Sequence, residues 1–138
     1  MVSVRMVSAP GPAPRIRDRV TACGGLLAAL LLLRFTPLRF TLAAARLAKR
    51  GARRSTSHTR ADEIVAACRA VSHWYPGRTA CLEISLAVLL AATLHRRSVD
   101  WCIGCRVRPF AAHAWIETRL QPVGEEWSGQ TFHPTVRI

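Results

Sequence analysis

Residues 109–117 read PFAAHAWIE, and the strand that this stretch predicts decides the fold class. A single histidine, His113, stands among small and apolar residues that follow a proline. Because side chains alternate between the two faces of a strand, His113, Trp115 and Glu117 share one face. The stretch therefore predicts a strand that carries a histidine and, on the same face, a carboxylate.

Predicted helices precede this strand, and further predicted strands surround it. Helical periodicity or helix start and stop signals cover residues 20–35, 38–50, 59–75 and 81–94. Strand composition covers residues 99–107, 112–118, 122–123 and 130–137. Helices first and antiparallel strands second predict an α+β fold, with N-terminal helices, a C-terminal antiparallel sheet and no internal repeat.

The 138 residues are the length of one domain with its own core. Three prolines and the lack of periodicity predict a disordered tail over residues 1–15. Residues 16–58 form a basic, Ala- and Leu-rich segment that we expect to be helical, and the polar run 53–58 is the best linker candidate. Residues 59–138 then hold the core of the fold.

The net charge of +12 lies almost wholly in the first half of the chain. Residues 1–60 hold 12 Arg and Lys against one acid, whereas residues 61–138 hold 8 against 7. This excess could steer an acidic peptide, a membrane surface or a nucleic acid to the protein, or it could reflect only coding bias towards arginine.

Five cysteines at irregular spacings do not form a disulfide framework, so we expect free thiols and a cytoplasmic protein. Cys102 and Cys105 form a CxxC, but residues three apart on a strand point to opposite faces. We therefore expect no metal site there.

The longest apolar run, residues 20–33, has 14 residues, fewer than the roughly 20 of a membrane-spanning helix. Arginines interrupt the apolar stretch that a signal peptide would need. We expect at most a peripheral membrane contact through this segment.

Cys81 stands where the fourth predicted helix begins. Unpaired N–H groups and the positive end of the helix dipole favour a thiolate there, and the same N–H groups can stabilise an oxyanion. With His113 as general base, this pair would make a nucleophilic site. The alternatives are a small buried cysteine and a hydrogen-bonded core histidine.

Several motifs together resemble one known family, the transglutaminase-like leader peptidases of lasso-peptide biosynthesis. They are CLEISLA at 81–87, WCIGCR at 101–106, PFAAHAWIE at 109–117 and PVGE at 122–125. The resemblance covers about residues 60–138 and implies a papain- or transglutaminase-like core. Some members carry a fused leader-recognition domain, but residues 1–60 are too few and too rich in Ala and Leu to hold one, so we expect none here.

The resemblance implies a cysteine peptidase that cleaves the leader from a ribosomally made precursor. By position, Cys81 matches the nucleophile and His113 the base. The third member of the triad is usually an aspartate, and Glu125 holds its place here, with Glu126 or Glu117 as substitutes. The implied partners are the precursor peptide, a separate leader-recognition protein and a lasso cyclase, and no cofactor or metal is expected.

Two other functions compete with leader cleavage. A thioester on Cys81 could be resolved by an amine, which would make the protein a transglutaminase-like acyltransferase. A non-catalytic basic adaptor would instead bind nucleic acid or membrane through residues 15–54. We expect no nucleic-acid partner, because no binding motif with interleaved aromatic residues is visible.

Overall fold

The computed structural model describes residues 14–75, 81–107, 110–119, 121–123 and 133–138. Within these ranges the helices are α1 (Ile16–Phe35), α2 (Leu38–Arg50), α3 (His58–Ser72) and α4 (Cys81–Leu94). The main strands are β3 (Asp100–Val107), β4 (Phe110–Thr118), β5 (Gln121–Pro122) and β6 (His133–Arg137). The predicted α+β fold is therefore confirmed, whereas most of the predicted tail at residues 1–15 lies outside the described residues.

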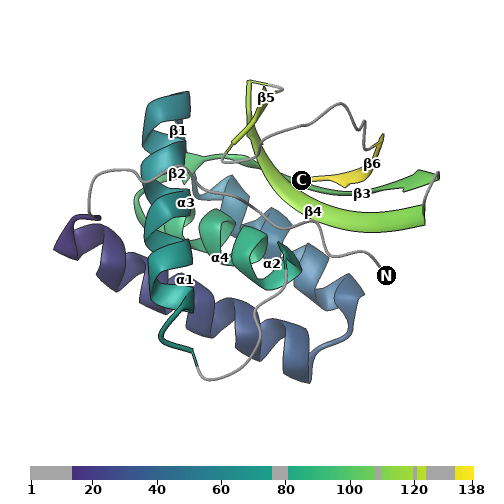
Figure 1. Ribbon diagram of the computed structural model, residues 1–138, viewed down its shortest axis with the longest axis horizontal. Coiled ribbons are helices and arrows are strands. Elements are labelled where there is room, and N and C mark those ends of the chain that lie inside the picture. The colour runs from purple at the N-terminus through teal and green to yellow at the C-terminus, as the bar shows by residue number, and fades with distance from the viewer. Residues whose placement is uncertain (1–13, 76–80, 108–109, 120, 124–132) are drawn as a thin grey trace.

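Helix α4 lies between α1 and the sheet and is the centre of the molecule (Figure 1). A helix that is apolar on all sides is stable only when it is covered on all sides. Nearly all residues of α4 are apolar, and most of them are buried. Gly25 of α1 allows the closest approach, because a methyl group there would lie 2.6 Å from the carbonyl oxygen of Ala87. The small residues of α1 thus bring two helix backbones together.

Helices α1 and α2 follow each other as predicted, with Pro37 at the start of α2. Helix α1 packs mainly on α4 and α3, and α2 packs mainly on α4. Helix α3 begins at His58, slightly before the predicted start, because the side chain of Ser57 accepts a hydrogen bond from the Arg60 N–H at 3.2 Å.

The main sheet has the strand order β5-β4-β3-β6 and is antiparallel throughout. In the β3–β4 register, His113 lies opposite Gly104 and Trp115 opposite Cys102. A second sheet, which the sequence did not indicate, is the parallel pair of β1 (Arg54–Ser55) and β2 (Arg97–Ser98). This pair places the polar run expected to be a linker beside the end of α4.

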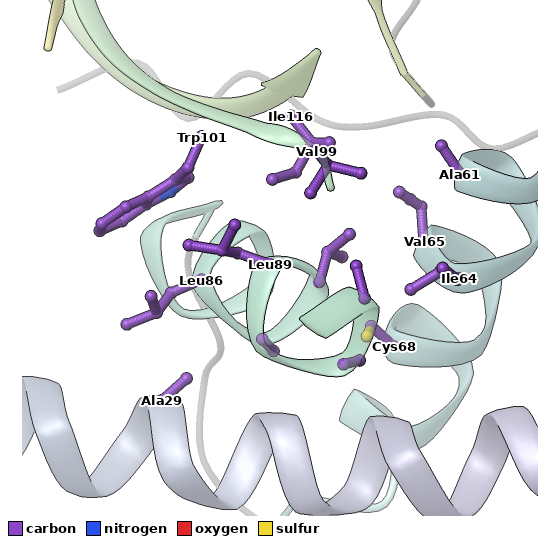
Figure 2. Packing of buried hydrophobic residues seen from close by; sticks show 14 of the residues in the cluster. Ala29, Ala61, Ile64, Val65, Cys68, Leu86, Leu89, Val99, Trp101 and Ile116 are labelled. Carbon is purple, nitrogen blue, oxygen red and sulfur yellow. The ribbon is translucent and has the colours of Figure 1, made fainter. Parts of the chain in front are cut away.

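The core fills the space between the sheet and the helices (Figure 2). Trp101 and Ile116 reach down from the sheet onto Leu86 and Leu89 of α4, and α3 closes one side. The buried indole N–H of Trp101 donates to the hydroxyl of Ser85 at 2.9 Å. This hydrogen bond joins the N-terminal half of α4 to the sheet.

Candidate active site

Cys81 is the first residue of α4 and is half-buried. The N–H groups of a first helical turn have no carbonyl partner within the helix. Ser85 follows one turn later on the same helix face, and its bond to Trp101 shows that this face turns towards the sheet. The predicted nucleophile therefore stands at the sheet-facing side of the N-terminal end of α4.

His113 lies in β4 and is 6% exposed. Its ring stacks on that of Trp115, with centroids 5.9 Å apart and planes 13° from parallel. The alternation expected from the sequence is present, because Ile116 belongs to the core cluster on α4 while Trp115 lies opposite Cys102. A buried, stacked imidazole has a fixed ring plane, as a general base requires.

A small, mostly apolar pocket lies between α4 and β4, and neither Cys81 nor His113 is among its lining residues. Its walls include Ile84 and Ser85, in the turn after Cys81, and Trp115, on which His113 stacks. Helix α4 and strand β4 also run in the same direction, since β3 returns antiparallel to both of them. Cys81 and His113 therefore lie towards the same end of the α4–β4 pair.

Gly104 makes room for the ring next to His113. A methyl group on Gly104 would lie 2.8 Å from Cη2 of Trp115 and 2.3 Å from the carbonyl oxygen of His133. Both distances are shorter than an ordinary carbon contact, so only glycine allows Trp115 and β6 to come this close to β3.

Glu117 is buried at the other side of Trp115. Its Oε1 accepts the Trp115 indole N–H at 2.8 Å, and its Oε2 lies 2.9 Å from Nη2 of Arg137 in β6. Glu117 is four positions after His113 in the strand, which corresponds to a distance of about 13 Å along β4. Glu117, which the sequence left as a possible triad acid, thus holds Trp115 and Arg137.

The remaining acid candidates, Glu125 and Glu126, lie outside the described residues. Cys102 and Cys105 lie on opposite faces of β3, since their β4 partners are Trp115 and Ala112. Burial raises the pKa of Cys102 to about 11, so it is a neutral thiol at physiological pH and a poor nucleophile. No group of three or more His, Cys, Asp or Glu that could hold a metal occurs in the described ranges.

A second polar cluster joins α1, α3 and the end of α4. Arg60 donates to both carboxylate oxygens of the buried Asp18, at 2.8 and 2.9 Å, and holds the pKa of that carboxyl below its usual range. His95 Nε2 lies 2.9 Å from the hydroxyl of Thr21 and 3.5 Å from Asp18. Burial is the main cause that lowers the pKa of His95.

The side chain of His95 is only 7% exposed, so this histidine belongs to the interior of the protein. One signal could have identified this cluster. Asp18 is the only acidic residue among the first 60 of a strongly basic chain. A single carboxylate among so many arginines indicates a specific ion pair. The cluster lies away from Cys81, and we assign it to stability.

Residues 23–137 match the transglutaminase-like superfamily. The chain therefore belongs to this superfamily, whose members are usually cysteine proteases or acyltransferases, and the match runs from α1 to β6. Neither a curated protein nor a solved structure matches the chain. Among the helices described, none is both long enough and apolar enough to cross a membrane.

Proposed function

We propose that this protein is a cysteine peptidase that cleaves the leader from a ribosomally made lasso-peptide precursor before a partner cyclase closes the macrolactam ring. One observation carries the proposal. Cys81 is the first residue of the largely buried helix α4. Ile84 and Ser85, in the next turn of this helix, line the same pocket as Trp115, and His113 stacks on the ring of Trp115. The family membership and the motif resemblance support the same chemistry.

The reaction begins when an imidazole nitrogen of His113 takes the proton of the Cys81 thiol. The thiolate sulfur attacks the scissile carbonyl carbon, and N–H groups in the first turn of α4 donate to the oxyanion. The intermediate collapses with loss of the C–N bond, and His113 gives its proton to the leaving amine. Water then adds to the thioester, with His113 as base, and its collapse releases the carboxylic acid and the free thiol.

Glu125 is proposed as the acid that orients His113 and offsets its positive charge as an imidazolium. Its place in the chain, shortly after β5 and β4, supports this role, since β5 pairs with the strand that carries His113. Glu126 is the alternative acid. Glu117 is assigned to positioning, because its two carboxylate oxygens face Trp115 and Arg137.

The substrate is held by partners as well as by this chain. We propose that a separate small protein grips the leader and presents the cleavage site, and that the lasso cyclase receives the freed amine. The reaction is placed in the cytoplasm, where free cysteines persist.

The test is a mass-spectrometric cleavage assay on the precursor with the recognition protein present. Cys81→Ala and His113→Ala should each abolish cleavage, and Glu125→Ala should slow it. Cys105→Ala is the matched control, because Cys105 is a half-buried cysteine like Cys81 but lies in β3. This variant should cleave the precursor at the wild-type rate. Normal cleavage by Cys81→Ala would disprove the proposal.

The acyltransferase is the second candidate, and the superfamily membership favours it equally. It uses the same thioester on Cys81, which an amine resolves in place of water. The product mass separates the two, since hydrolysis gives a shortened precursor and acyl transfer gives a joined product.

A further inference from the structure

Helix α1 carries a continuous apolar stripe on its outer face. The stripe consists of Ile16, Val20, Leu27, Leu31 and Phe35, whose spacings of four, seven, four and four place them on one side of the helix. All five are exposed, Ile16 at 81% and Phe35 at 72%. Isolated exposed apolar residues are ordinary, but a row along a whole helix marks an interaction surface.

This stripe is separate from the core of the protein. The buried residues of α1, among them Ala22, Leu26 and Ala29, lie on the opposite side of the helix and face α4 and α3. Helix α1 is thus apolar on both sides, and among the described residues only the side towards α4 and α3 is covered. Two further exposed apolar residues, Leu38 and Phe40, follow at the start of α2.

The charge around the stripe has one sign. Exposed arginines lie along α1 and at the start of α2: Arg17, Arg19, Arg34 and Arg39. The only acid in these two helices, Asp18, is buried and bound by Arg60. A ligand for this surface must therefore be apolar at its centre and negative around it.

These properties select among possible occupants. A second copy of this chain would place the same positive charge against the stripe, and that repulsion opposes a dimer. A nucleic acid would meet the arginines but would leave five large apolar side chains without contact. An acidic protein would also complement the arginines, and a lack of binding to anionic vesicles would favour it over a membrane.

We propose that α1 lies in the surface of an anionic lipid bilayer, with its stripe among the acyl chains and the arginines of α1 and α2 at the phosphates. Helices with an exposed apolar face flanked by basic side chains bind membranes in this way, parallel to the surface and without crossing it. The helix has 20 residues, or about 30 Å, along which both interactions operate at once. The surface is independent of the proposed cleavage chemistry.

The test is flotation of the purified chain with vesicles of phosphatidylcholine alone and with one quarter phosphatidylglycerol. The wild type should float with the anionic vesicles, and only weakly with the neutral ones. The variant Val20→Gln/Leu27→Gln/Leu31→Gln should lose at least tenfold in apparent affinity. Its circular dichroism spectrum should stay unchanged, because all three side chains are exposed.

Trp74→Gln is the control, since Trp74 is 89% exposed and belongs to neither α1 nor α2, and it should bind like the wild type. Cys81→Ala should also bind like the wild type, so failure of the peptidase proposal is measured separately. Absence of binding to anionic vesicles would overturn the inference. Equal binding by the triple variant would also overturn it, as would a wild-type dimer that the triple variant converts to monomer without any vesicle binding.

Discussion

The bond between Trp115 and Glu117 predicts a measurable coupling between the two side chains. Glu117→Ala removes the acceptor at 2.8 Å and leaves the indole N–H buried without a partner. An orphaned buried donor costs about 1–3 kcal/mol. Loss of the ion pair with Arg137 adds little, because Arg137 is 39% exposed and such pairs contribute about 0–1 kcal/mol.

We therefore expect Glu117→Ala to lower the free energy of unfolding by about 2 kcal/mol, or the melting temperature by roughly 6–8 °C. Glu117→Gln keeps an oxygen acceptor and should lose about half as much. Both are measured by urea denaturation at constant pH. In a Trp115→Phe background no indole N–H would be left without an acceptor. Glu117→Ala should therefore lower the free energy of unfolding there by at least about 1 kcal/mol less than it does in the wild type.

The same variants report on the site. If Glu117 holds the ring on which His113 stacks, the cleavage rate should fall in the order wild type, Glu117→Gln, Glu117→Ala. Arg137→Lys serves as the control, because it keeps the positive charge beside Glu117 and should change the unfolding free energy by less than about 1 kcal/mol. A coupling energy below about 0.5 kcal/mol in the double-mutant cycle would refute the reasoning, since independent sites agree within that error.

Three further predictions follow from the contacts between helices and from the buried groups. Gly25→Ala should destabilise the fold by about 1–3 kcal/mol, because its methyl would lie 2.6 Å from a carbonyl oxygen of α4. The neighbouring Gly24→Ala, whose nearest contact is 3.8 Å, should stabilise by up to about 1 kcal/mol, and thermal melting of the pair compares them. Since folding lowers the pKa of His95, the folded state favours its neutral form, and stability should fall as the pH drops below about 6.5. Denaturation at several pH values should show a smaller loss in His95→Gln, and an equal loss would contradict this account. Iodoacetamide labelling of the native protein at pH 8, followed by peptide mass mapping, should modify Cys81 and spare Cys102, whose pKa is about 11; labelling of both at one rate would contradict the burial argument.

The sequence predicted the parts of this fold that depend on local pattern. Helix α2 has the expected bounds, because Pro37 and Gly51 mark its ends. The alternation in β4 correctly placed His113, Trp115 and Glu117 on one face. Each of these features is encoded within one element, where periodicity and end signals are sufficient.

The rest depended on contacts between segments far apart in the chain. Nothing local connects Glu117 with Arg137, or Asp18 with Arg60 and His95, so these partners could not be assigned in advance. The parallel pairing of β1 with β2 joins residues more than 40 positions apart. The assignment of Cys81 and His113 as a pair remains a prediction, and Glu125 lies outside the described residues.

The arrangement of layers relates the two proposals to each other. Helix α4 has α1 on one side and the sheet on the other, so the outer stripe of α1 and strand β4 lie on opposite sides of the molecule (Figure 1). A bilayer under α1 would therefore leave the pocket between α4 and β4 open to a peptide that arrives from solution. Helix α4 therefore lies between the proposed lipid-facing surface and the proposed catalytic site, and a change on the outer face of α1 should alter membrane binding without altering the chemistry proposed at Cys81.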